Sequence, residues 1–279
     1  CLAWAGFDVL SLANNHMNDY GPRALAETLD YIDLLGMARV GAGRDLEEAR
    51  APAIMERDGR RIAFLAYAEP LWSVVEAKRA DAYRAVTRAE TRLQGFPPQA
   101  EAPRYPDRPG TGRAGVAIAR LPDMVEDVRR TIERYRPDQL FVSVHWGEEH
   151  ENLPRTFQRS FGRAAIDAGA TAVLGHHPHI LQPIERYRGG IIAYSLGNFV
   201  FDMAADHTYE TVALRLWLEG GSLARAEIVP LIIPRYTYAP ELAAGEDADR
   251  ILNKLRDWTR QLGGDMAIEG STGIIDFDS

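Results

Sequence analysis

Short apolar runs alternate with segments of helical periodicity along the first two thirds of the chain. Residues 7–13 (FDVLSLA) form an apolar run that ends at Asn14, which predicts a buried strand followed by a polar loop. Between Pro22 and Gly36 apolar residues recur every three or four positions, which predicts a helix that begins near the proline and ends at the glycine. A strand, a loop and a helix in this order are typical of layered α/β folds.

The next strand signals form a hairpin. Residues 38–41 predict a weak strand, and residues 53–57 and 61–67 flank the pair Asp58-Gly59. Because Asp-Gly favours the tight two-residue turn between antiparallel strands, we expect the two flanking strands to pair with each other.

Residues 69–113 interrupt this order. They are charged and rich in proline and glycine, as in GFPPQAEAPRYPDRPGTG, and such a composition does not sustain a regular strand or helix. We expect an irregular excursion there, with one helix near residues 74–90.

Regularity returns after the excursion. A helical pattern precedes the apolar, β-rich residues 140–146 (LFVSVHW), so that a helix and a strand are expected in turn. Pro154 then opens a second helix that Gly169 closes, and residues 171–174 predict a strand that ends at Gly175. The apolar face of the first of these helices consists of Met124, Val125, Val128, Ile132 and Tyr135.

The last third of the chain is rich in strand signals. A hairpin turn is expected at residues 188–190 (RGG), and a last strong helix at about residues 248–262 makes residues 240–279 a C-terminal helix and tail. We expect residues 1–279 to form a single α/β domain, with antiparallel strands added towards its end. The predicted strands of this part are residues 191–195, 198–201, about 211–218 and about 223–233.

Composition narrows the class of protein. Of the 279 residues 46% are hydrophobic and 26% are charged, as in a globular chain, and one cysteine excludes an internal disulfide framework. The net charge of -8 gives no basic surface for nucleic acid, so no nucleic-acid partner is expected. No window approaches the roughly 18 to 20 apolar residues of a membrane span. Residues 1–10 lack the features of a signal peptide, and because Cys1 stands in place of methionine we expect a truncated beginning.

Three polar clusters follow predicted strands. They are residues 14–16, residues 145–149 and residues 176–179. Because ligand sites in α/β folds lie beyond the carboxyl ends of strands, we expect the three clusters to converge.

The cluster His176-His177-Pro178-His179 holds three of the seven histidines. Imidazole is the commonest side-chain metal ligand, and residues i and i+2 of an extended segment point to the same side. Pro178 favours an extended conformation of the preceding residue, so His177 and His179 are expected to face one metal site or two adjacent metals. His176 then faces away and is expected to support a ligand or contact substrate. The competing interpretation is a loop of unrelated, solvated histidines.

His145 suits the role of a third imidazole, because it ends an apolar strand and carboxylates follow it. We expect Glu149 to orient a ligand or contact substrate. A histidine after a strand is also common as a satisfied core residue, and Glu148 and Glu149 are in that case simply solvated.

Asn14, Asn15 and His16 form the third cluster. An amide oxygen can ligate a hard or borderline metal, and a neighbouring imidazole can exchange a proton with substrate. Asp19 is placed to orient the imidazole of His16. The alternative is ordinary turn chemistry, in which asparagine and aspartate bond to the nearby backbone.

Residues 194–202 (YSLGNFVFD) are a fourth candidate. Ser195 lacks the G-x-S-x-G surroundings of a hydrolase nucleophile, which favours a structural strand junction. Asn198 and Asp202 are expected in the wall of the pocket.

Five strings in this chain resemble the poly-γ-glutamate capsule biosynthesis family of CapA type, a branch of the calcineurin-like metallophosphatase superfamily. They stand in the family's order and reach over most of the chain to about residue 233, which makes the series more specific than any one motif. The strings are AGFDVLSLANNHMNDYG at residues 5–21, VGAGRDLEEAR at 40–50, VSVHWGEE at 142–149, GHHPHILQPIE at 175–185 and YSLGNFVFD at 194–202.

The resemblance implies a four-layer α/β/β/α sandwich with two divalent metal ions, of the Mn, Fe or Zn type, at the strand ends. Asn15, His145 and His177 would ligate one metal, and His179 would reach the other. His16 would contact substrate and act as a general acid.

This chain departs from the superfamily pattern in two respects. The superfamily commonly follows its Asn-His pair directly with an acidic residue, whereas Met17 stands here and Asp19 comes later. The first two metal motifs of the superfamily should precede Asn15 and are not in this chain, and two such strand-loop-helix steps would take roughly 60 residues. We therefore expect the domain to be incomplete at its N-terminus.

The resemblance leads to two expected functions. The first is a metal-dependent, phosphoesterase-type hydrolase that acts on a phosphoester or an anionic polymer. The second is a non-catalytic component of the cell envelope, membrane-anchored or secreted, that binds anionic polymer or capsule-synthesis membrane proteins. A third interpretation is an inert α/β domain whose histidines are structural.

Overall fold

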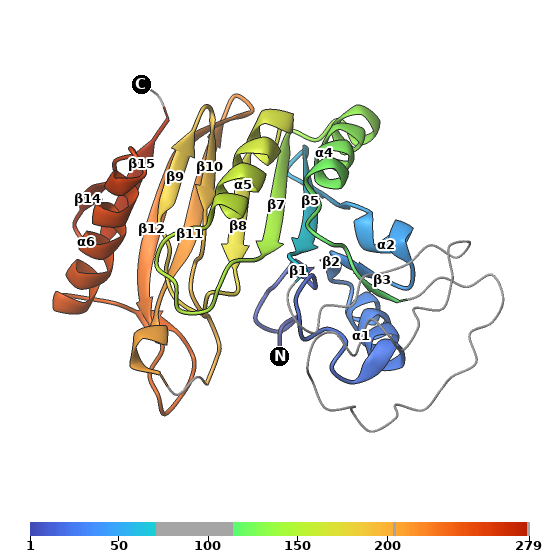
Figure 1. Ribbon diagram of the computed structural model, residues 1–279, viewed down its shortest axis with the longest axis horizontal. Helices are drawn as coiled ribbons and strands as arrows, with labels where there is room; N and C mark the ends of the chain where they lie inside the picture. Colours follow the sequence, from blue (N-terminus) through green and yellow to red (C-terminus); the bar gives the residue numbers. More distant parts are fainter. Residues whose placement is uncertain (71–113, 203–204, 278–279) are drawn as a thin grey trace.

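A six-stranded mixed sheet forms the centre of the molecule. The structure is a computed structural model that describes residues 1–70, 114–202 and 205–277. In this sheet β5, β7, β8 and β10 are parallel, while β4 and β9 are antiparallel strands at its two edges. The carboxyl ends of the parallel strands therefore lie at one end of the sheet, where the arrowheads of β5, β7 and β8 point in Figure 1. In spatial order the strands are β4 (Ala53–Arg57), β5 (Arg60–Ala68), β7 (Gln139–His145), β8 (Ala172–His176), β10 (Gly190–Ala193) and β9 (Ile184–Tyr187).

Two helices cover one face of this sheet, α4 (Leu121–Tyr135) and α5 (Thr156–Ala168). Alternate residues of the strands, such as Leu65 and Val142, pack against Phe161 of α5 in one buried cluster. Removing such apolar side chains from water is the main driving force that holds the helices on the sheet.

A second sheet covers part of the opposite face. Its order is β11-β12-β15-β14, with β13 paired to β12, and the helix α6 (Glu246–Gln261) shares its core. Ile228 of β12 and Leu255 of α6 belong to the same buried cluster as Phe141 of the first sheet. The strands are β11 (Glu210–Glu219), β12 (Ser222–Ile232), β13 (Glu241–Leu242), β14 (Ala267–Glu269) and β15 (Thr272–Asp276).

The N-terminal segment packs on the same face, next to β5. The parallel pair of β1 and β2 and the buried side of α1 form a third cluster with Ala66 and Ala68. The elements of the N-terminal segment are β1 (Val9–Ser11), α1 (Gly21–Leu34), β2 (Ala38–Val40), β3 (Ala42–Gly43) and α2 (Leu46–Arg50). Two further short elements come later in the chain, β6 (Gly115–Val116) and the 3-10 helix η1 (Asp206–Thr208).

A buried ion-pair network joins α2, α4 and β5. Asp127 of α4 accepts hydrogen bonds from Arg50 at 2.7 and 2.9 Å and from the Tyr67 hydroxyl at 3.0 Å. Burial, followed by the charge of Asp127, raises the pKa of Tyr67 well above its ordinary value of 10.0. The network fixes elements that are distant in sequence on the helix-covered face.

The expected α/β sandwich is confirmed, as are its principal helices and its first hairpin. Asp58 and Gly59 have φ angles of 51° and 73° and join β4 to β5, as a two-residue turn between antiparallel strands requires. The helix predicted near residues 74–90 lies outside the described residues.

Two predictions near the end of the chain are wrong. Residues 198–201 form no strand: the amide of Asn198 donates to the carbonyl oxygen of Thr208 at 3.2 Å, which closes the segment into a loop. The tail expected after the last helix contains β14 and β15, which extend the second sheet by pairing with each other and with β12. That pairing joins segments far apart in sequence, so it leaves no local pattern.

Among the described residues, none of the helices combines the length and the apolar character that crossing a membrane requires.

Candidate metal centre

The three predicted clusters meet beyond the carboxyl ends of β1, β7 and β8. His145 is the last residue of β7 and lies directly opposite His176 of the parallel neighbour β8, with 4.9 Å between the two ring centroids. The ring of His177 lies 4.6 Å from that of His145. The parallel sheet thus brings together loops that are far apart in sequence, as its strand-end geometry predicts.

Asn15 joins this group from the loop after β1. Its Oδ1 lies 2.8 Å from Nε2 of His145, and both residues are buried. An amide oxygen and an imidazole nitrogen that face each other at this distance can share a hydrogen bond or face one metal ion. The predicted proximity of the two side chains is therefore present.

The predicted extended conformation of the histidine loop is wrong. His177 and His179 have φ angles of 104° and 62°, a region that residues other than glycine adopt only when the surrounding structure holds them there. The loop turns back on itself, and the carbonyl oxygen of Pro178 accepts a hydrogen bond from the backbone N–H of His150 at 2.9 Å. The two rings nevertheless lie close, at 5.9 Å between centroids.

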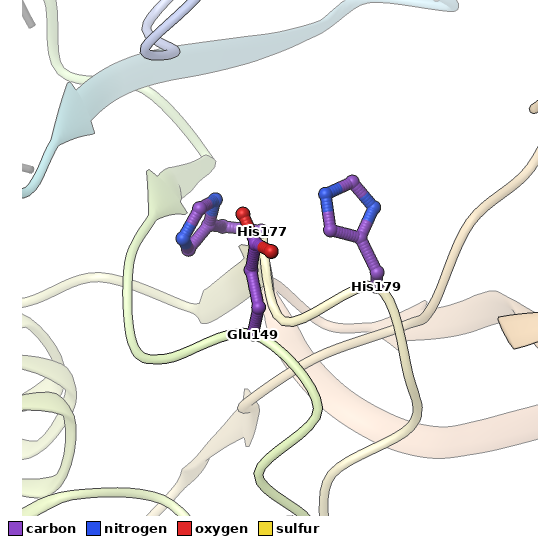
Figure 2. A group of neighbouring side chains, drawn as sticks. All are labelled: Glu149, His177 and His179. Atoms are coloured by element: carbon purple, nitrogen blue, oxygen red, sulfur yellow. The ribbon is translucent and has the colours of Figure 1, made fainter. Parts of the chain in front are cut away.

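Glu149 reaches the same place from the loop after β7. One ligand atom from each of Glu149, His177 and His179 can be chosen so that all three lie within 4.8 Å of one another. Figure 2 shows the carboxylate between the two imidazole rings. The sequence placed Glu149 in a supporting role, and its spacing alone gave no sign that it would face both rings.

Burial favours the neutral form of two imidazoles of this centre, His145 and His177. Burial, followed by the neighbouring rings of His176 and His177, lowers the pKa of His145 far below its ordinary value of 6.5. Burial and the neighbouring His179 lower the pKa of His177 to about 4, and Glu149 opposes this shift. A neutral imidazole is the form that ligates metals.

Two buried nitrogens of these rings lack a hydrogen-bond partner in the described part of the chain. They are Nδ1 of His145 and Nδ1 of His177. Buried polar atoms without a partner are rare in folded proteins and call for an explanation such as an ion. These nitrogens, together with amide and carboxylate oxygens, make a donor set that fits a divalent ion of the Mn, Fe or Zn type.

His16 and Asp19 form a pair on the exposed side of the centre. Nδ1 of His16 lies 2.8 Å from Oδ2 of Asp19, and the backbone N–H of His16 donates to Oδ1 of Asn14 at 2.9 Å. The distance to Asp19 fits the orienting role predicted for that carboxylate.

The remaining predicted residues have different surroundings. Nδ1 of His179 lies 2.8 Å from Oδ1 of Asn198. His176 is hydrogen-bonded to backbone atoms of Leu174 and Ala13, and burial lowers its pKa to about 4. Asp202 is exposed, and its place in the wall of the pocket stays a prediction. Ser195 is buried and donates to the carbonyl oxygen of Ile180 at 2.7 Å, as a strand junction would require.

A second pair of imidazoles was not predicted. Nε2 of His207 lies 2.8 Å from Nδ1 of His150, and both side chains are exposed. His150 lies in the loop after β7 and His207 in the short 3-10 helix η1, so neither periodicity nor spacing could have paired them.

Comparison with known proteins identifies the family. The family described as "Bacterial capsule synthesis protein PGA_cap" matches residues 1–203. The chain belongs to the PGA_cap family. The matched range contains the residues of the centre, from Asn14 to Asn198.

Curated relatives carry names from the same process. The PGA_cap chain is 31% identical over 254 residues to "Capsule biosynthesis protein CapA" of Bacillus anthracis, covering 90% of this chain and 54% of that protein. It is 32% identical over 235 residues to "PGA biosynthesis protein CapA" of Bacillus subtilis (strain 168), covering 84% and 53%. The chain spans about half the length of these relatives.

A solved structure also matches. The crystal structure of a hypothetical protein from Thermus thermophilus covers 84% of this chain and 79% of its own, with a TM-score of 0.45 and 17% sequence identity.

Proposed function

We propose that this PGA_cap chain carries the metal centre of a hydrolase of the phosphoesterase type. Asn15, His145, His177 and His179 would hold two divalent ions of the Mn, Fe or Zn type. The observation that carries the proposal is the convergence of these side chains from three loops, with two buried imidazole nitrogens that lack a partner among the described residues.

The residues of the chain would divide the chemistry between them. Divalent ions bound in such a centre supply Lewis-acid activation of water and of the scissile group. When the imidazole of His16 is protonated, its Nδ1–H donates to Asp19, and the second ring nitrogen delivers a proton to the leaving oxygen. The buried Asn15 and His145 would remain rigid, because both are enclosed by the surrounding loops.

The substrate class follows from charge and from the relatives. The net charge of -8 disfavours direct binding of a polyanion, so an anionic substrate would be bound through the metal ions. A phosphoester or an anionic polymer such as poly-γ-glutamate is the proposed substrate, since relatives are named for capsule and PGA biosynthesis. Because these names refer to capsule biosynthesis, we also propose a place in the cell envelope, next to capsule-synthesis membrane proteins.

Metal analysis of single-residue variants tests this proposal. The wild-type protein, loaded with Mn²⁺ and desalted, is expected to retain metal and to hydrolyse bis(p-nitrophenyl) phosphate. His145→Ala, His177→Ala and His179→Ala should each lose metal and at least roughly tenfold in rate. His207→Ala, an exposed histidine outside the proposed ligand set, is the matched control. Unchanged metal content and rate in all three variants would refute the proposal.

A second function has specific support in the relatives' names, which refer to synthesis and not to hydrolysis. In this alternative the centre binds anionic polymer without turnover. Binding of poly-γ-glutamate by the metal-loaded protein, with no cleavage of phosphoester or amide bonds, would favour it. If the metal-loaded protein binds neither the polymer nor a capsule-synthesis partner, this alternative is excluded.

A further inference from the structure

We propose that Glu149 is a direct ligand of one metal ion that His177 and His179 hold together, whereas the resemblance assigns these two histidines to different ions. The inference rests on the proposed function, since it concerns the same centre, and it adds an anionic ligand to it. Neither the resemblance nor the comparisons assign this carboxylate to a metal.

The geometry of three side chains carries the proposal. Glu149, His177 and His179 each offer one ligand atom, and these atoms lie within 4.8 Å of one another. Figure 2 shows the carboxylate placed between the two rings. One carboxylate with two imidazoles is a donor set that suits Zn, Mn and Fe.

The charge of the proposed ligands gives a second reason to expect Glu149 at the metal. Asn15, His145, His177 and His179 are all neutral ligands, so none of them offsets the charge of a divalent ion. Two nearby carboxylates have other partners: Asp19 lies 2.8 Å from His16, and Glu148 lies 3.9 Å from Arg155. Glu149 instead faces the imidazoles of His177 and His179.

The backbone holds Glu149 in place from both sides. Before it, Gly147 has a φ of 88° and donates its N–H to a carboxylate oxygen of Glu69 at 2.8 Å. After it, His150 has a φ of 64° and donates its N–H to the carbonyl oxygen of Pro178 at 2.9 Å. The second bond joins the Glu149 loop directly to the histidine loop. A ligand held by such contacts needs little rearrangement to bind a metal.

The burial of His177 distinguishes a metal site from a group of side chains that lie together by chance. His177 is 7% exposed, and its Nδ1 has no hydrogen-bond partner within the described residues. A metal ion between His177 and Glu149 would engage an otherwise unpaired buried ring and the exposed carboxylate at once. The competing roles of Glu149 are contact with substrate and simple exposure to solvent, and neither requires it for metal binding.

The test compares two neighbouring carboxylates. Glu149→Gln keeps the shape of the side chain and removes its charge, and Glu148→Gln makes the same change one residue earlier on a side chain that is 66% exposed. Calorimetric titration with Mn²⁺ and Zn²⁺ and the visible absorption spectrum of the Co²⁺-loaded protein measure the metal site without any substrate. Circular dichroism of the metal-free proteins confirms that the fold is retained.

The proposal predicts that Glu149→Gln weakens binding at one metal site at least roughly tenfold and changes the Co²⁺ spectrum, while Glu148→Gln behaves as the wild type. Unchanged affinity and spectrum in Glu149→Gln overturn it, even if the catalytic rate falls, because a substrate contact would then suffice. The His177→Ala variant separates the two hypotheses. If it loses metal while Glu149→Gln does not, only the assignment of Glu149 fails; if the wild type binds no metal, the proposed function fails.

Discussion

At the scale of single residues, the pair of His16 and Asp19 carries the proton transfer in the proposed reaction. Asp19→Asn keeps the size of the side chain and removes the charge that stabilises a protonated His16. The rate of phosphoester hydrolysis is expected to fall roughly tenfold to a hundredfold, within the range of general acid catalysis, while metal content stays the same. Steady-state kinetics and metal analysis measure the two effects.

The control for this prediction is a double variant. If His16 and Asp19 act as a unit, adding Asp19→Asn to His16→Ala costs little further rate. Losses that simply multiply would show that Asp19 acts elsewhere.

A second prediction at this scale concerns Gly175, which lies two residues before His177 and so affects the position of the histidine loop. A Cβ at this position would lie 2.1 Å from the carbonyl oxygen of Tyr194 and 2.5 Å from Nε1 of Trp146. Trp146 Nε1 donates to that same oxygen at 2.8 Å. Gly175→Ala should therefore lower the free energy of unfolding by about 1–3 kcal/mol and weaken metal binding, as measured by urea unfolding and Mn²⁺ titration.

Gly189→Ala is the matched control for Gly175→Ala, because a Cβ at Gly189 would meet no atom within 4 Å. It should leave both the free energy of unfolding and metal affinity near the wild-type values. Equal effects of the two substitutions would contradict the packing argument.

At the scale of secondary-structure elements, Asp127 joins α2, α4 and β5. It is 1% exposed and accepts from Arg50 and Tyr67. Asp127→Ala leaves the largely covered Arg50, 12% exposed, and the buried Tyr67 hydroxyl without this partner, and should lower the free energy of unfolding by about 3–5 kcal/mol. Glu126→Ala removes an exposed carboxylate 3.4 Å from the same arginine and should cost less than about 1 kcal/mol. Urea unfolding that shows similar losses for both would contradict this account of the network.

Glu210 joins the start of β11 to α6. Burial alone would raise its pKa, but hydrogen bonds from Arg250, at 2.8 Å, and from Lys254 prevail and lower the pKa below 4.5. The folded state therefore binds this proton less readily than the unfolded state. Its stabilising contribution is complete above the unfolded pKa near 4.5 and is lost as the pH falls through the folded pKa.

The substitution Glu210→Gln tests this linkage. At pH 7 it should lower the free energy of unfolding by roughly 1–2 kcal/mol, and the difference from wild type should shrink towards pH 3. Glu219→Gln, at the exposed far end of β11, is the control. A difference that is independent of pH would show that Glu210 contributes through packing and not through charge.

The elements that could be predicted from sequence are those with a local cause. The Asp58-Gly59 hairpin and the helices α1, α4, α5 and α6 follow from turn chemistry and helical periodicity. β14 and β15 escaped prediction because their pairing with β12 lies between distant segments. Residues 198–201 have a strand-like composition, but the side-chain bonds of Asn198 to His179 and Thr208 decide their conformation.

At the scale of the whole molecule, the sheet determines which clusters meet. Neighbouring parallel strands that end at one edge explain why His145 and His177 could be expected together from sequence. Asn15 joins them from β1, which pairs with β2 in a separate small sheet packed on β5. The turn of the histidine loop, the direction of Glu149 and the His150–His207 pair depend on loop conformations, which leave no periodic signal. The residues of this arrangement lie within the range that the PGA_cap family matches, residues 1–203.

The central claim is that this arrangement binds divalent metal ions, and anomalous diffraction tests it most directly. Crystals grown with Mn²⁺ or Zn²⁺ and measured at the absorption edge should show an anomalous peak beside Asn15 and His145, and a second between His177, His179 and Glu149. Each peak should lie about 2.0–2.3 Å from its ligand atoms. Well-ordered side chains at these positions with no anomalous peak, at metal concentrations in large excess over the protein, would contradict the account.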